Sequence, residues 1–293
     1  MARVAFIGLG NMGGGMAANL AKSGHDVRAY DLSSDALARA EAAGCLPTES
    51  GRAAVEGAEA VVTMLPAGGH VEQVYEELVG RLAAGAVLID CSTIDVDTAK
   101  RVAERARGRG LQAVDAPVSG GIAAANAGTL TFMVGGTEAA FARAEPYLAD
   151  MGKAVIHAGS NGAGQAAKIC NNMLLGAEMV ATCEAFLLAE KLGLDPQRFY
   201  DIASVSSGQS WSMTSYCPVP GVGPETPADR GYQGGFAAAL MLKDLRLAME
   251  AAQGAGADTP MGKRAAELYE AYVGAGEGGS DFSGIIRMLG RGS

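Results

Sequence analysis

A glycine-rich turn near the N-terminus constrains the fold of this 293-residue chain more than any other feature. The turn, Gly8-Leu9-Gly10-Asn11-Met12-Gly13, follows an apolar stretch and opens a segment with helical periodicity. In such a pattern the first glycine permits a tight turn, the second lets a pyrophosphate approach the backbone, and the third allows close packing of helix against strand. The helix N-terminus then faces the phosphates. The sequence therefore predicts a dinucleotide-binding unit that begins with these residues.

An acidic residue after the second predicted strand supports this interpretation. Asp31 lies 18 residues after Gly13. An acid at this place accepts hydrogen bonds from the ribose hydroxyls and repels a 2′-phosphate. The three following residues, Leu32-Ser33-Ser34, supply no cation, so the sequence favours NAD over NADP. The alternative is a plain glycine turn with Asp31 as a helix cap.

The first half of the chain alternates β-branched runs with alanine-rich amphipathic segments. Strands are expected at residues 4–8, 27–30, 60–64, 87–90, 113–115, 131–134 and 154–157, with helices that include 12–23, 34–43 and 98–108. Strands that alternate with helices indicate a doubly wound, mostly parallel sheet.

The pattern changes after Gly164. Residues 165–192, about 28 in number, contain no proline and one internal glycine, and would form roughly 42 Å of helix. More helices are expected at 196–203, 236–253 and 262–273, and the loop 216–235 between them is long enough to suggest a functional role. The predicted fold class is therefore α/β. A Rossmann-type domain, residues 1–162, is joined by a long interdomain helix to an all-helical domain, residues 163–293.

Composition narrows the classes of function. The net charge of −9 argues against nucleic acid and an anionic membrane as partners. The sequence contains no run of 18 apolar residues, so no membrane-spanning helix is expected. The first apolar stretch is typical of a strand rather than a signal peptide. The five cysteines are scattered without a C-x-x-C pair, which favours reduced thiols in the cytoplasm. The three histidines lack metal-ligand spacing, so no metal is expected.

Three further loops follow predicted strands. In Asp115-Ala116-Pro117-Val118-Ser119-Gly120-Gly121, a serine hydroxyl and bare backbone N–H groups could cradle a carboxylate, although a structural glycine turn explains the segment equally well. The loops 64–70 and 91–93 lie where the carboxyl ends of strands border the ligand crevice of an open sheet. Both could also be plain loops.

Two lysines on predicted helices are candidates for chemistry. Lys168 stands four residues before Asn172, so the two share a helix face. The rest of that face is apolar or small, which would desolvate the ammonium group and lower its pKa towards a range useful for proton transfer. A surface lysine on an amphipathic helix is the alternative. Lys243 precedes Asp244, either as a weak ion pair or as a cation that closes over the cofactor.

Together these segments resemble the 3-hydroxyacid dehydrogenase family over essentially the whole chain. The blocks 6–13, 115–121 and 164–172 are similar to those of the whole family. The blocks 206–208, 218–221, 232–236 and 243–245 resemble its hydroxyisobutyrate branch.

The resemblance implies NAD-dependent oxidation of 3-hydroxyisobutyrate to methylmalonate semialdehyde, a step of valine catabolism, with Lys168 as general acid and base. It implies substrate binding by Ser119, Gly120, Gly121 and Asn172. It implies cofactor binding by Gly8, Gly10, Asn11, Met12, Gly13, Asp31, Leu65, Pro66, His70, Thr93 and Lys243; at His70 some relatives have asparagine. It also implies a homodimer or homotetramer in which the helical domain supplies much of the contact.

Other functions stay open on the sequence alone. A semialdehyde reductase of the same family, acting on tartronate, glyoxylate or succinate semialdehyde, would often use NADPH, which Asp31 disfavours. A non-catalytic dinucleotide-binding protein would not need Lys168, and an imine-reducing relative would have another residue there. Residue types do not separate 3-hydroxyisobutyrate from 3-hydroxypropionate or serine, because one methyl group is worth only about 1–3 kcal/mol of discrimination.

Overall fold

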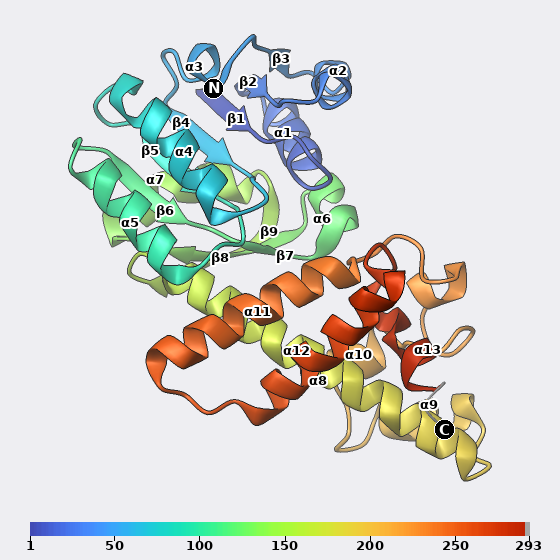
Figure 1. The fold of residues 1–293 in the computed structure, drawn as a ribbon. Coiled ribbons are helices and arrows are strands. Elements are labelled where there is room, and N and C mark those ends of the chain that lie inside the picture. The colour runs from blue at the N-terminus through green and yellow to red at the C-terminus, as the bar shows by residue number, and fades with distance from the viewer. Residues whose placement is uncertain (291–293) are drawn as a thin grey trace. The chain divides into compact units, whose positions relative to one another are not determined.

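The computed structural model describes residues 1–290, and the chain divides into two compact units, Met1–Lys168 and Ile169–Ser293. The first unit is a sheet covered by helices and the second is helical (Figure 1). This confirms the predicted class, a Rossmann-type domain followed by a helical domain. The predicted boundary after residue 162 falls where helix α8 (Ala163–Lys191) begins, whereas the compact units divide within that helix.

The sheet of the first unit has a parallel part and an antiparallel edge. Its parallel strands lie in the order β3 (Leu46–Pro47), β2 (Asp26–Tyr30), β1 (Arg3–Ile7), β4 (Ala60–Thr63), β5 (Val87–Asp90) and β6 (Gln112–Asp115). At the edge, β8 (Leu130–Gly135) is antiparallel to β6 and β7 (Val118–Ser119) and parallel to β9 (Gly152–Gly159). The strand order reverses direction between β1 and β4, which is where open sheets of this kind bind ligands. The sequence did not predict β3 and β7, because two residues are too few to show a period.

Helices cover both faces of this sheet (Figure 1). One face carries α1 (Gly13–Lys22), α2 (Ser34–Ala42), α6 (Gly121–Ala127) and α7 (Glu138–Ala149); the other carries α3 (Gly51–Ala54), α4 (Gly68–Leu78) with the turn η1 (Val79–Arg81), and α5 (Val96–Arg107). The side chains of β1 alternate between them: Val4 and Phe6 join the core of the first face, and Ala5 and Ile7 that of the second. A strand buried on both faces explains the unbroken apolar run in the sequence.

The second unit is built around the distal part of α8. It contains the helices α9 (Pro196–Ala203), α10 (Trp211–Thr214), α11 (Ala238–Ala255), α12 (Pro260–Tyr272) and α13 (Ile286–Leu289), with the turns η2 (Pro227–Arg230), η3 (Val273–Glu277) and η4 (Phe282–Ile285). Helix α8 packs closely on α11, because a side chain at Gly176 would meet Met241 and Leu245. Tyr269 and Tyr272 are buried in the same core.

Helix α8 differs from one expectation. Among residues 1–290 it is the helix that is long and apolar enough to cross a membrane, judged by length and composition only. The sequence has no uninterrupted run of 18 apolar residues, whereas α8 reaches the criterion on average hydropathy. Core helices of globular proteins meet the same criterion, so this is weak evidence for a membrane segment.

Candidate functional site

The candidate residues of the first unit follow the carboxyl ends of neighbouring parallel strands. Strand β1 pairs with β2 on one side and β4 on the other, and β5 joins β4 to β6. Because parallel strands end at the same edge, the loops after β1, β2, β4, β5 and β6 all lie along it.

The glycine turn after β1 packs tightly against the protein at Gly8 and Gly13 (its closed side) and has no neighbouring atoms at Gly10 (its open side). Gly8 N donates to Tyr30 O over 2.9 Å, and Leu9 N donates to Asp31 Oδ2 over 2.6 Å. A side chain at Gly13 would collide with the Gly8 carbonyl oxygen, whereas one at Gly10 would meet no atom within 4 Å. The backbone beside Gly10 is therefore bare, which fits the approach of a pyrophosphate.

The carboxyl group of Asp31 shapes this turn. Its Oδ1 accepts a hydrogen bond from Ser33 N over 2.8 Å, while Oδ2 holds Leu9 N. Helix α2 is capped by Ser33, whose hydroxyl accepts from Ala36 N, so the alternative of Asp31 as the helix cap is wrong.

Hydrogen bonds tie together the loops after β4 and β5. The hydroxyls of Thr63 and Ser92 donate to Asp90 Oδ1 over 2.7 Å and 2.6 Å, and Leu65 N donates to Ser92 Oγ over 2.8 Å. Asp90 and Ser92 are buried. The predicted cofactor positions Leu65, Pro66 and Thr93 stand on these joined loops.

Two predicted cofactor positions, His70 and Met12, lie at the beginnings of helices. His70 is an exposed residue in the first turn of α4, which begins at Gly68, so the loop after β4 is shorter than the expected 64–70. Met12 is the half-buried N-cap residue of α1, next to the exposed Asn11.

The predicted substrate loop requires its glycines for backbone reasons. Ser119 ends β7 and pairs with Thr131 of β8. Gly120 has a φ of +134° and Gly121 a φ of +71°, in the region that favours glycine. The turn therefore requires both glycines, and the half-buried Ser119 is the polar side chain beside them.

Lys168 is not a surface lysine. Only 7% of it is exposed, so the surface alternative is wrong. It lies in the second turn of α8 and belongs to the same compact unit as the glycine turn. A buried amine in a cofactor-binding unit is a candidate for proton transfer.

The second unit holds its own polar cluster. Asn172 Nδ2 donates to Asp244 Oδ2 over 2.5 Å, and Asn172 Oδ1 accepts from Asn171 Nδ2 over 3.0 Å. Lys243 Nζ lies 3.8 Å from Asp244 Oδ1. Of the two interpretations of Lys243, the ion pair with Asp244 is thus observed.

The beginning of α8 is held by two residues, Asp115 and Gln165, to which the sequence assigned no role of their own. Asp115 accepts hydrogen bonds from Gly162 N over 2.7 Å and Gln165 N over 3.0 Å. The fully buried side chain of Gln165 bonds to the loop after β5 at Ser92 O and Ile94 N. These partners are 47 to 73 residues apart in the chain, so no local pattern reveals them.

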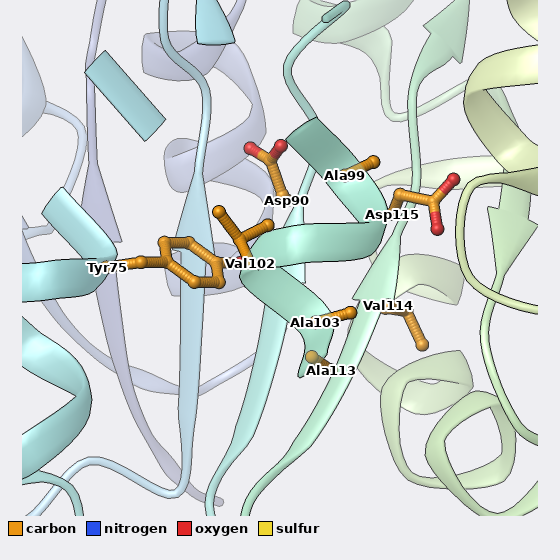
Figure 2. Close-up of a pocket in the computed structure, with 8 residues that line it drawn as sticks. All are labelled: Tyr75, Asp90, Ala99, Val102, Ala103, Ala113, Val114 and Asp115. Atoms are coloured by element: carbon orange, nitrogen blue, oxygen red, sulfur yellow. The ribbon is translucent and has the colours of Figure 1, made fainter. Parts of the chain in front are cut away.

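The pKa of the Asp115 carboxyl is also shifted from its usual value. Burial raises the pKa of its carboxyl to about 7, although the backbone N–H groups of Gly162 and Gln165 oppose the shift. Figure 2 shows Asp115 and Asp90 on neighbouring strands, with their carboxyl groups turned in different directions. The cavity that they line with Tyr75 has a volume of about 10 Å³, room for about one water molecule. It is too small for a cofactor or substrate.

Other features of the described chain lie apart from the predicted site. A cavity of about 420 Å³ in the second unit lies between α8, α9 and residues 206–213, and no predicted site residue lines it. Residues 1–290 contain no group of three potential metal ligands. All five cysteines are free.

Comparisons with known proteins cover nearly the whole chain. Residues 3–159 match the NAD-binding domain of 6-phosphogluconate dehydrogenase, and residues 162–289 match the NAD-binding family of NADP-dependent 3-hydroxyisobutyrate dehydrogenase. A 3-hydroxyisobutyrate dehydrogenase of Pseudomonas aeruginosa is 50% identical, with 98% of each chain covered. An NAD-dependent L-serine dehydrogenase of that organism is 46% identical over 99% of this chain and 98% of the relative. The structure of Mycobacterium tuberculosis 3-hydroxyisobutyrate dehydrogenase with L-serine has a TM-score of 0.95 and 45% identity, and covers 99% of both chains.

Proposed function

Because this chain belongs to the 3-hydroxyisobutyrate dehydrogenase family and is an NAD-dependent oxidoreductase, we propose that its substrate is 3-hydroxyisobutyrate and its product methylmalonate semialdehyde. The reaction would be a step of valine catabolism. The full-length similarity to relatives named for this activity supports the proposal.

Lys168 is the proposed general acid and base. The observation that carries this proposal is its burial at the start of α8, in the compact unit that also contains the glycine turn. Bound NAD supplies the acceptor for the two electrons of the oxidation. The neutral amine of Lys168 takes the proton of the substrate hydroxyl, and in the reverse direction the ammonium group returns it.

The remaining polar groups would orient the substrate. Ser119 offers a hydroxyl, and Gly120 and Gly121 offer backbone N–H groups, which suit a carboxylate. Asn172, one turn beyond Lys168 on α8, is proposed for the hydroxyl region of the substrate on the strength of the family resemblance.

The cofactor would be held by the loops at the carboxyl edge of the sheet. The bare backbone beside Gly10 suits the pyrophosphate, and Leu65, Pro66 and Thr93 stand on the loops after β4 and β5. Asp31 would discriminate against NADP, because no cation follows it to balance a 2′-phosphate. The assignments of His70 and Lys243 to the cofactor stay predictions.

L-Serine is a second candidate substrate. One relative is an L-serine dehydrogenase, and a solved relative is described with L-serine. The two substrates differ by a methyl group and an ammonium group on the carbon that carries the carboxylate. A screen of 3-hydroxyisobutyrate, 3-hydroxypropionate, L-serine and the semialdehydes, each with NAD(H) and NADP(H), would rank them by kcat/KM.

The largest effect is expected from Lys168→Ala, which should lower kcat by about 10²–10⁴ because proton transfer loses its placed partner. Affinity for NADH, followed by its fluorescence, should change little. Lys191→Ala, at the exposed end of the same helix, is the matched control and should keep full turnover. Near-normal turnover of Lys168→Ala would falsify the assignment.

We also propose a cytoplasmic homodimer or homotetramer. Apolar side chains of the helical unit, including Leu174 and Leu188 on α8 and Ile202 on α9, are exposed in the single chain and could pack against a second copy. Sedimentation analysis of the purified protein would show a monomer if this is wrong.

A further inference from the structure

The amide of Gln165 holds the backbone on both sides of Thr93. Its Nε2 donates to Ser92 O over 2.7 Å, and its Oε1 accepts from Ile94 N over 3.1 Å. Gln165 is fully buried, and both bonds run from the first turn of α8 to the loop after β5. One side chain thus fixes the two neighbours of a proposed cofactor position.

The two partners require one donor and one acceptor at the end of this side chain, which the amide supplies. A backbone carbonyl can only accept and a backbone N–H can only donate, so the partners determine which end of the amide is nitrogen and which is oxygen. Leucine would offer neither group and would leave two buried polar atoms unpaired. An ionised glutamate would offer two acceptors and would repel the Ser92 carbonyl oxygen.

The same residue is anchored at its backbone to another strand. Gln165 N donates to Asp115 Oδ2 at the end of β6, beside the bond from Gly162 N to the same carboxyl group. Ser92 in turn receives Leu65 N from the loop after β4 through its hydroxyl. A continuous set of hydrogen bonds therefore runs from both loops of the cofactor edge into the first turn of α8.

Lys168 is three residues further along this helix. On an α-helix, residues three apart lie on the same side and one above the other, so the position of Gln165 sets that of Lys168. Both residues belong to the compact unit Met1–Lys168.

We propose that Gln165 is a positioning residue, whose amide fixes Lys168 against the Ser92–Ile94 loop so that the amine stands at the correct distance for proton transfer. This inference rests on the proposed function, in which Lys168 is the general acid and base. Gln165 itself would touch neither substrate nor cofactor.

The first test is Gln165→Leu, which keeps the size of the side chain and removes both hydrogen bonds. A displaced Lys168 should lower kcat by about 10²-fold, the effect of a misplacement of about 1 Å. The KM for the hydroxy acid should change little, and the affinity for NADH should fall by much less than kcat, because Thr93 stands on the released loop. Gln73→Leu, an exposed glutamine on α4, is the matched control and should leave all three unchanged.

The second test is Gln165→Glu, because a protonated carboxyl reproduces both groups of the amide. Its O–H can donate to Ser92 O while its C=O accepts from Ile94 N. The ratio of its kcat to that of the unaltered protein should therefore rise by about tenfold as the pH is lowered from about 9 to about 6. The carboxyl groups of Asp115, whose pKa of about 7 lies within this range, and of Asp90 stand near this position in both proteins, so the ratio compares the two proteins against the same background. A rescue of kcat without a matching rescue of NADH affinity distinguishes the positioning of Lys168 from a general disturbance of the structure.

The following outcomes would overturn the proposed positioning role of Gln165. Unchanged kcat in folded Gln165→Leu would overturn the inference, and so would a loss of NADH affinity as large as the loss of kcat. If Gln165→Leu does not fold, the ratio for Gln165→Glu decides, and a ratio independent of pH overturns the inference. Failure of the proposed function is distinguishable, because it would appear as normal turnover of Lys168→Ala.

Discussion

Two glycine-rich loops of this protein were both predicted to be functional, yet they are shaped in different ways. The turn 8–13 is held by Tyr30 and Asp31, which belong to or follow the next strand. The loop 216–235 is held by Asp281, which accepts from Tyr216 OH over 2.9 Å and from Phe236 N over 2.8 Å. Asp281 is 45 to 65 residues away from these partners. A motif can be recognised when the residues that shape it lie close by in the sequence, and the second loop does not meet this condition.

Asp281 is the central anchor of the second loop. It is fully buried and also accepts hydrogen bonds from the backbone N–H and the hydroxyl of Ser283. Burial raises the pKa of its carboxyl, while these donors oppose the shift. Four donors on one buried carboxyl mean that its removal leaves several polar groups without a partner.

The largest effect on stability is therefore expected from Asp281→Ala. Loss of this buried acceptor should lower the free energy of unfolding by about 3–5 kcal/mol, measured by urea denaturation. Asp281→Asn keeps one acceptor oxygen and should cost less. A loss below about 1 kcal/mol would show that the loop 216–235 is held by its own residues, and the contrast with the turn 8–13 would then be wrong.

The glycine turn can be tested with a pair of variants. Gly13→Ala would force a side chain onto the Gly8 carbonyl and should destabilise the protein by about 1–3 kcal/mol, as overpacking does. Gly10→Ala has room within the protein, so stability should be kept while NADH affinity falls. Urea denaturation and NADH fluorescence separate the two effects. Equal stability losses in both variants would contradict the account of an open and a closed side.

A further effect, on how stability depends on pH, concerns Asp115, the buried carboxyl of the first unit. Its pKa is about 7 in the folded protein and near 4 when unfolded, so the folded state binds the extra proton between these values. This contribution to stability is full below the unfolded pKa and is lost as the pH rises through about 7, with a slope of at most about 1.4 kcal/mol per pH unit. Asp115→Asn should remove that slope from the curve of unfolding free energy against pH. An unchanged slope would mean that another group causes it.

Most of the fold could be predicted because its causes are local. Alternating strands and helices, the long helix and the glycine turn follow from hydrophobic periodicity and from glycine positions within short windows. The two-residue strands β3 and β7 carry too little pattern. The start of α4 at Gly68 was missed because two glycines at the beginning of a helix look like a loop.

By itself, the sequence determined the α/β class, the dinucleotide turn, the family and the candidate residues, because each depends on residue types at short spacing. Only the tertiary structure decided that Lys168 is buried, that Ser33 rather than Asp31 caps α2, and that Asp115 and Gln165 hold the beginning of α8. The physical reason is that hydrogen bonds and burial join residues whose separation along the chain leaves no local pattern.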